Sequence, residues 1–135
     1  MKGHYFVAHH YCQEQNDDLR DAIARGLEDT DLDPIYADDL YRSNPLLDKL
    51  LAMISTTWFG IYDMTGCSPN VLLELGIGIA CRKPLYITCM DESDIPSDIK
   101  GYEFIKYGSA RELVKELKTK VSPWWSLADA ELSES

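Results

Sequence analysis

Residues 58–89 read WFGIYDMTGCSPNVLLELGIGIACRKPLYITC, and this stretch decides the predicted fold class. It holds two short apolar runs, at 58–62 and 85–89, each typical of a strand buried on both faces. Between them Ser68 is suited to cap a helix and Pro69 to occupy its first position, and the helix should end near Cys81. The stretch therefore predicts a strand, a helix and a second strand.

The flanking sequence repeats this alternation. We expect further strands at 5–8, 34–37 and 103–107, and helices at 17–27, from 43–45 to Ile54, and from Ser109 to Val121. Strands separated by helices predict a parallel sheet with helices on both faces. Right-handed crossovers favour a flavodoxin-like, doubly wound α/β fold with five strands in the order 2-1-3-4-5. We expect one domain over residues 1–122 and a C-terminal tail over 123–135.

The composition excludes several classes of function. Thirteen Lys and Arg against 23 Asp and Glu give a net charge of −10, which repels phosphate backbones and argues against a nucleic-acid partner. No stretch approaches the ~20 apolar residues of a membrane span, and the N-terminus lacks a signal-peptide core, so we expect a cytoplasmic protein without a membrane partner. Four widely spaced cysteines predict free thiols, and His9, His10 and Cys12 are too few to predict a metal site.

The predicted strand order places the functional site. Ligands of such sheets bind beyond the carboxyl ends of strands one and three, where the strand order reverses. The sequence puts His9, His10 and Tyr11 after the first strand, and Asp63, Met64, Thr65 and Gly66 after the third.

Glu74 lies inside the apolar run of the helix at 69–81. Helical spacing puts it on one stripe with Asn70, Gly78 and Cys81, opposite an apolar face of Leu72, Leu75 and Ile79. Because burying an unpaired carboxylate is costly, we expect something to compensate it. Either Glu74 faces a ligand and its glycine neighbour lets a flat molecule approach, or the glycines serve tight helix–sheet packing and Glu74 pairs locally. Asp63 is likewise either a site residue or a loop cap.

The pattern Asp63-x-Thr-x-x-x-Pro-Asn-Val-x-x-Glu74-Leu-Gly, followed by a basic-Pro strand, resembles the nucleoside 2-deoxyribosyltransferase-like superfamily. It is equally similar to the TIR-like relatives found in bacterial nucleotide-signalling and defence proteins. The resemblance spans about residues 4–90, and its specific part is residues 63–84.

The resemblance implies a role for each matching residue. Glu74 stands where deoxyribosyltransferases carry their nucleophile and where catalytic TIR domains carry the Glu that cleaves the nicotinamide–ribose bond of NAD. It implies that Asp63 and Asn70 hold ribose hydroxyls. We expect the remaining substrate contacts from Tyr5, His9, His10, Thr65, Gly66, Ser68 and Gly78. The second acid of deoxyribosyltransferases is missing, because Gly66, Cys67 and Ser68 occupy its places, and Pro69-Asn70 departs from the TIR pattern.

Three functions follow as hypotheses. The first is an enzyme that acts on the N-glycosidic bond of a nucleoside, nucleotide or NAD-like dinucleotide, with Glu74 and Asp63 as catalytic residues and with no metal or cofactor. The second is a non-catalytic TIR-like nucleotide sensor or effector. The third is a flavin or phospho-acceptor module. The resembled superfamily and the paired Trp124 and Trp125 also predict a homo-oligomer.

Overall fold

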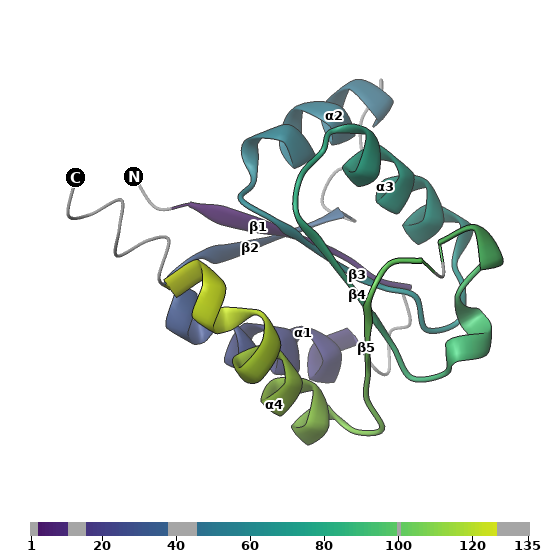
Figure 1. Cartoon of the computed structure of the whole chain (residues 1–135). Helices are drawn as coiled ribbons and strands as arrows, with labels where there is room; N and C mark the ends of the chain where they lie inside the picture. The colour runs from purple at the N-terminus through teal and green to yellow at the C-terminus, as the bar shows by residue number, and fades with distance from the viewer. Residues whose placement is uncertain (1–2, 11–15, 38–45, 100, 127–135) are drawn as a thin grey trace. The chain divides into compact units, whose positions relative to one another are not determined.

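Residues 4–106 contain a parallel five-stranded sheet with the strand order β2-β1-β3-β4-β5 (Figure 1). The computed structural model describes residues 3–10, 16–37, 46–99 and 101–126. The strands are β1 (His4–Ala8), β2 (Asp33–Tyr36), β3 (Gly60–Asp63), β4 (Leu85–Cys89) and β5 (Phe104–Lys106). Each neighbouring pair is parallel, so the predicted flavodoxin-like strand order is confirmed.

Two compact units make up the described residues. The first comprises residues 3–10 and 33–106 within the described ranges, and contains the sheet with α2 (Leu46–Thr56) and α3 (Pro69–Ala80). The second comprises residues 16–32 and 107–126, and contains α1 (Asn16–Gly26) and α4 (Ala110–Lys120). Three short 3-10 helices lie wholly within the described residues: η1 (Glu28–Thr30), η3 (Glu92–Asp94) and η4 (Ser97–Ile99).

The core of the first unit lies between one face of the sheet and the helices α2 and α3. Alternate strand residues on this face are buried, and Leu50 and Ile54 of α2 and Val71 and Leu75 of α3 pack in the same cluster. The strand members of this cluster include Phe6, Ala8, Tyr62, Met64, Ile87 and Cys89. Because side chains alternate along a strand, Tyr5, Val7 and Ile61 belong to the opposite face, and they are buried as well.

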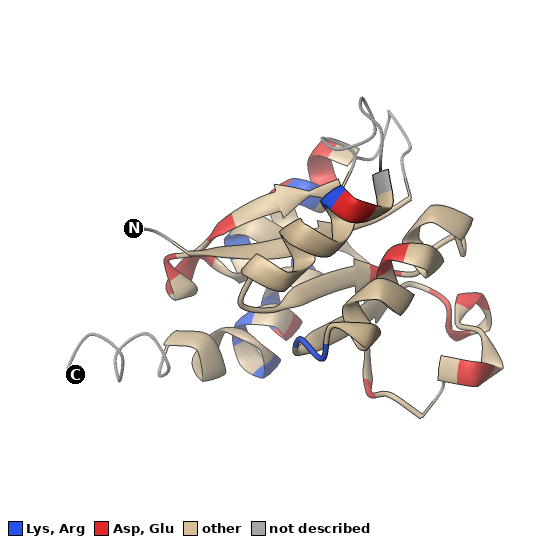
Figure 2. Cartoon of the chain, turned by 90° about the horizontal axis from the view of Figure 1, so that it is seen from above, with Lys and Arg blue, Asp and Glu red and all other residues tan. Residues whose placement is uncertain are grey.

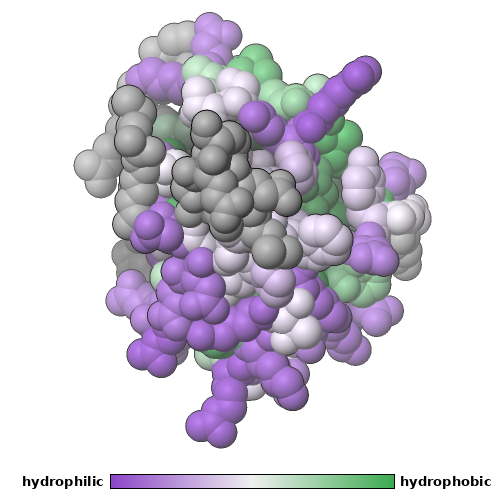
Figure 3. Space-filling view, turned by 60° about the vertical axis from the view of Figure 1, so that its left-hand side comes forward, coloured by the Kyte–Doolittle hydropathy of each residue, from purple (hydrophilic) through white to green (hydrophobic). Residues whose placement is uncertain are grey.

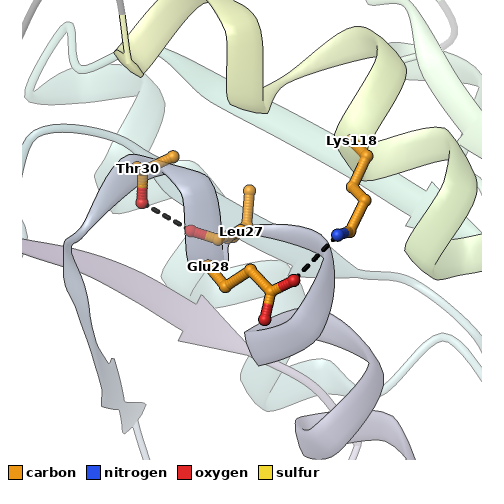
Figure 4. A network of polar contacts seen from close by, with 4 residues as sticks. All are labelled: Leu27, Glu28, Thr30 and Lys118. Carbon is orange, nitrogen blue, oxygen red and sulfur yellow. Dashed lines mark hydrogen bonds and ion pairs between the residues drawn. The ribbon is translucent and has the colours of Figure 1, made fainter.

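The second unit is built on the pairing of α1 and α4. Gly26 permits close contact, because a Cβ there would lie 2.7 Å from the Leu117 Cβ. At the same end, Lys118 Nζ donates to Glu28 Oε1 at 2.8 Å, and the Thr30 hydroxyl donates to the Leu27 carbonyl at 2.7 Å (Figure 4). The first of these contacts joins η1 to α4, and the second lies within η1 and its cap.

Most predicted boundaries agree with these elements. The helix expected from Ser68-Pro69 is α3, and the one expected from Ser109 is α4, where the Ser109 hydroxyl accepts the Glu112 N–H at 3.2 Å. β3 begins at Gly60 rather than 58, although the Trp58 N–H already donates to the His4 carbonyl at 2.9 Å. The predicted helix start at 43–45 lies outside the described residues, as does Cys12.

Charge is unevenly distributed over these elements. Figure 2 shows basic residues on α4 and acidic residues along the loop that carries η3 and η4. Cys67, Cys81 and Cys89 are free thiols. Among the described residues no helix combines the length and the apolar character that a membrane crossing requires. The boundary expected at residue 122 stays a prediction, although the Ser126 hydroxyl donates to the Asp29 carbonyl at 2.7 Å and so ties the start of the expected tail to the second unit.

Candidate functional site

The loop from Asp63 to Ser68 leaves the carboxyl end of β3 and leads into α3. Asp63 is 2% exposed, and its Oδ1 accepts the Thr65 N–H at 3.1 Å while its Oδ2 accepts the Thr88 hydroxyl at 2.6 Å. The loop-cap interpretation of Asp63 therefore describes what its carboxylate does here. Its proposed contact with a ribose stays a prediction.

Residues that follow the carboxyl end of β4 hold the 63–68 loop in place. The Met90 N–H donates to the Thr65 hydroxyl at 3.1 Å, and the Gly66 N–H donates to Asp94 Oδ2 at 2.9 Å. The backbone turns sharply at Gly66 (φ +82°) and Cys67 (φ +48°), a conformation that costs a non-glycine residue about 1 kcal/mol. The hydrogen bonds to the loop after β4 offset this strain and fix the geometry.

The carboxyl end of β1 meets this loop at His10. A Cβ on Gly66 would lie 3.8 Å from the His10 ring, so the residues predicted after strands one and three do come together. His9 turns toward β2 instead: its Nδ1 donates to the His10 carbonyl at 3.0 Å, and its ring lies edge-on to Tyr36 with centroids 6.3 Å apart. Imidazole groups therefore flank the edge of the sheet.

Tyr5 does not reach this edge. It is the second residue of β1, is 1% exposed, and stacks on Phe59 with ring centroids 5.4 Å apart. The expected contact between Tyr5 and a substrate is therefore replaced by a core role, because β1 runs past it for three more residues before its carboxyl end.

Glu74 occupies the buried face of α3. It is 2% exposed and shares that face with Val71, Leu75 and Gly78. The predicted stripe is thus partly wrong: Asn70 is exposed, and so is Leu72, which was expected on the apolar face. Helix α3 carries its one charged residue inward, where a carboxylate is costly unless the surroundings compensate it.

Tyr62 is the aromatic residue next to Glu74. Its side chain reaches α3 at Gly78, one turn beyond Glu74, where its hydroxyl fills the place that a Cβ would occupy. Burial raises the pKa of the Tyr62 phenol, and the neighbouring Glu74 charge raises that pKa further. The phenol is therefore protonated at neutral pH, and Glu74 lies near enough for its charge to act on the phenol.

This packing corrects the interpretation of Gly78 as an opening for a flat ligand. Because Tyr62 takes the space above it, Gly78 serves close contact between helix and sheet, the alternative that the sequence left open. Gly76 differs, since a Cβ there would have no neighbour within 4 Å.

The two predicted catalytic acids are not brought together. Asp63 pairs in register with Thr88 and alternates with Tyr62, whose side chain faces α3. Alternation along the strand therefore directs the carboxyl groups of Asp63 and Glu74 to opposite faces of the sheet. The catalytic role expected of Asp63 stays a prediction.

The helix start is the remaining part of the predicted site. Ser68 stands at the N-cap position of α3 as predicted, but its side chain makes no capping hydrogen bond. Ser68 is buried, Thr65 is half-buried, and Asn70 is exposed in the first turn. Among the residues that the structure describes, no group of three or more His, Cys, Asp or Glu side chains is placed to hold a metal ion.

Two residues of the loop network were not predicted from the sequence. Thr88 is a polar residue inside an apolar strand, and the parallel register that sets it beside Asp63 would have identified it. Asp94 is one of four acids in residues 90–99, and nothing in the sequence distinguishes it from its acidic neighbours.

Comparison with known proteins gives likenesses of structure alone. No protein-family model matches the sequence, and no curated protein matches it significantly. Among solved structures, the CMP N-glycosidase BcmB of Clostridium botulinum aligns with a TM-score of 0.69 and 18% identity, over 87% of this chain and 99% of its own. A 2-desoxiribosyltransferase from Leishmania mexicana aligns with a TM-score of 0.63 and 12% identity, over 88% and 99%.

A third neighbour carries a different chemistry on the same fold. A diflavin flavoprotein A3 from Nostoc sp. aligns with a TM-score of 0.64 and 16% identity, over 97% of this chain and 98% of its own. The fold is flavodoxin-like. At these identities the likenesses establish the fold, and one fold hosts many functions.

Proposed function

We propose that this protein cleaves or exchanges the N-glycosidic bond of a nucleoside, nucleotide or NAD-like dinucleotide, with Glu74 as the reacting or stabilising carboxylate. The observation that carries the proposal is Glu74 itself, a 2% exposed carboxylate on the inward face of an otherwise uncharged helix, beside the Tyr62 phenol. Two structural neighbours that are named for N-glycosidic chemistry support the general kind of reaction.

The chemistry requires one carboxylate. In one route a Glu74 oxygen attacks the anomeric carbon while the carbon–nitrogen bond breaks and its electron pair stays on the base. A nucleobase then takes a proton from solvent, whereas nicotinamide leaves as a neutral molecule without one. Water or a second base then displaces Glu74 from the glycosyl ester. In the other route Glu74 stabilises the oxocarbenium-like transition state through its charge, and water attacks directly. In both routes the uncharged Tyr62 phenol stays beside the carboxylate.

The test is turnover followed by chromatography of the released base. We expect release from deoxynucleosides, CMP or NAD, and a loss of about a hundredfold or more in Glu74→Gln, which keeps the shape of the side chain and removes its charge. Glu103→Gln, at an exposed acid outside the site, should leave the rate unchanged. Absence of turnover on every substrate, or equal turnover by Glu74→Gln, contradicts the proposal.

Only the nucleophilic route forms a covalent adduct between the sugar and Glu74. If Glu74 is the nucleophile, rapid acid quenching during turnover should yield a peptide containing Glu74 that carries the mass of the sugar. If Glu74 acts by charge alone, the same quench yields the unmodified peptide, while the rate still falls in Glu74→Gln.

A non-catalytic, TIR-like nucleotide-binding module is the second candidate. The engagement of both Asp63 oxygens in the loop favours it, together with the absence of an acid at 66–68. It predicts a rise in melting temperature with nucleotide and no released base.

The third hypothesis, a flavin module, predicts that the purified protein is yellow. Self-association, which the 70% exposed Trp124 is consistent with, is tested by sedimentation.

A further inference from the structure

A basic groove runs between α1 and α4, wholly within the second unit and independent of the proposed function. Its volume is about 520 Å³, within the range of small-molecule sites. Figure 3 shows hydrophilic side chains gathered in the lower half of the view, over this pair of helices. The groove is lined by Asp21, Ala22 and Arg25 of α1 and by Ala110, Arg111, Val114, Lys115, Lys118 and Thr119 of α4.

The lining carries four basic side chains and one acid in a protein whose net charge is −10. Arg25 is paired with Asp21 at 3.1 Å, and Lys118 with Glu28 at 2.8 Å. Arg111 and Lys115 form no ion pair with any residue that the structure describes. The groove therefore holds two exposed cations that have no ion-pair partner within the described ranges.

The arrangement of these cations is unfavourable for the helix alone. Arg111, Lys115 and Lys118 stand at i, i+4 and i+7, so their charges line one face of α4 and repel one another. Elsewhere on the same helix, Lys120 pairs with Glu116 at 2.7 Å, four residues away. The side facing the groove thus lacks the acids that α4 uses on its other side, and a bound anion would relieve the repulsion.

The net charge restricts the kind of anion. A polyanion such as nucleic acid would meet repulsion from the many acids outside the groove, whereas a small anion experiences mainly the local field. The guanidinium fork of Arg111 matches the oxygens of a phosphate, and the Lys115 ammonium adds a point charge. The buried Ala22 and half-buried Val114 provide an apolar floor beside them.

We propose that the α1–α4 groove binds the phosphate group of a small phosphorylated molecule, with Arg111 and Lys115 as its main ligands. Arg25 and Lys118 extend the positive field, and the Asp21 carboxylate limits the affinity by competing for Arg25.

The test is calorimetric titration with inorganic pyrophosphate, which has neither base nor sugar and so does not report on the site at Glu74. We expect a dissociation constant of about 1 mM or tighter, weakened about tenfold or more in the double variant Arg111→Gln, Lys115→Gln. The matched control is Lys120→Gln, on the same helix but outside the groove, which should bind as the unaltered protein does. Amide resonances of residues 21–25 and 110–119 should shift on titration.

A second variant tests whether the acid in the groove weakens the binding of pyrophosphate. Asp21→Asn removes the acid from the groove and frees Arg25, so pyrophosphate should bind about two- to fivefold more tightly. Affinity that is unchanged in both the double variant and Asp21→Asn overturns the proposal, as does the absence of binding at low salt. Equal binding of a dicarboxylate such as succinate would overturn the assignment to phosphate, and tighter binding of duplex DNA the assignment to a small molecule.

The source of the phosphate is resolved by comparing ligands. Inorganic phosphate, pyrophosphate and a nucleoside monophosphate are titrated into the Glu74→Gln protein with and without the double substitution. Binding of all three that depends on Arg111 and Lys115 indicates recognition of the phosphate alone. A dependence seen for the monophosphate only would instead show that the groove also reads the nucleoside, and no dependence for any of them refutes the groove. None of these outcomes depends on turnover.

Discussion

The helices α3 and α4 are nearly equal in length and opposite in the way they use charge. Helix α4 buries Leu113 and Leu117 and keeps its charged residues at the surface or half-buried. Helix α3 buries its one charged residue, Glu74, and leaves Leu72 and Leu73 38% and 47% exposed. The difference teaches that an amphipathic pattern orients a helix from its sequence, whereas a helix that is apolar on every side is oriented by its neighbours.

The largest effect that we expect is a difference in the free energy of unfolding between alanine variants of two leucines of α3. Leu75→Ala should lower the free energy of unfolding by about 2–5 kcal/mol, because Leu75 is 1% exposed in the core cluster. Leu72→Ala should cost less than about 1 kcal/mol, since much of that side chain is already in solvent. Urea unfolding of both variants checks the prediction, and equal losses would restore the orientation of α3 that the sequence suggested.

The next effect concerns the two glycines of α3. Gly78→Ala should cost about 1–3 kcal/mol, because the new Cβ overlaps the Tyr62 hydroxyl. Gly76→Ala should stabilise the protein by about 0.5–1 kcal/mol, since nothing lies within 4 Å of its Cβ and alanine favours the helix. Thermal or urea unfolding measures both. Adding Tyr62→Phe to Gly78→Ala should recover part of the loss, and no recovery would mean that the hydroxyl is not the obstacle.

The smallest effect compares the two helix caps. Ser109→Ala should cost about 1 kcal/mol, because the Ser109 hydroxyl accepts the Glu112 N–H of α4. Ser68→Ala should cost about 0.5 kcal/mol or less, because Ser68 stands at the same position of α3 but makes no capping bond. Equal losses in urea unfolding would show that Ser68 caps α3 in solution.

Much of the fold could be predicted from residue patterns. The apolar runs around Val7, Tyr62 and Ile87 identified three of the strands, and Pro69 and Ser109 marked the starts of two helices, because these signals depend on neighbours in the chain. The strand order followed from the handedness of crossovers. The meeting of His10 with Gly66 followed in turn from that order.

The site was only partly predictable. Glu74 was recognisable because a carboxylate within a run of apolar residues is unusual. Its partner Tyr62 was not, since contact across a helix–sheet interface depends on how α3 is rotated. Asp63 appeared equivalent to Glu74 in the sequence, but the alternation of β3 separates the two carboxyl groups.

The sequence by itself determined the alternating elements and the order of the strands, because periodicity, capping residues and chain handedness act locally. Only the tertiary structure decided which face of α3 turns inward, which acid caps the loop, and that Arg111 and Lys115 of α4 line a groove with α1. Those outcomes depend on packing and charge between residues far apart in the chain, which no local pattern records.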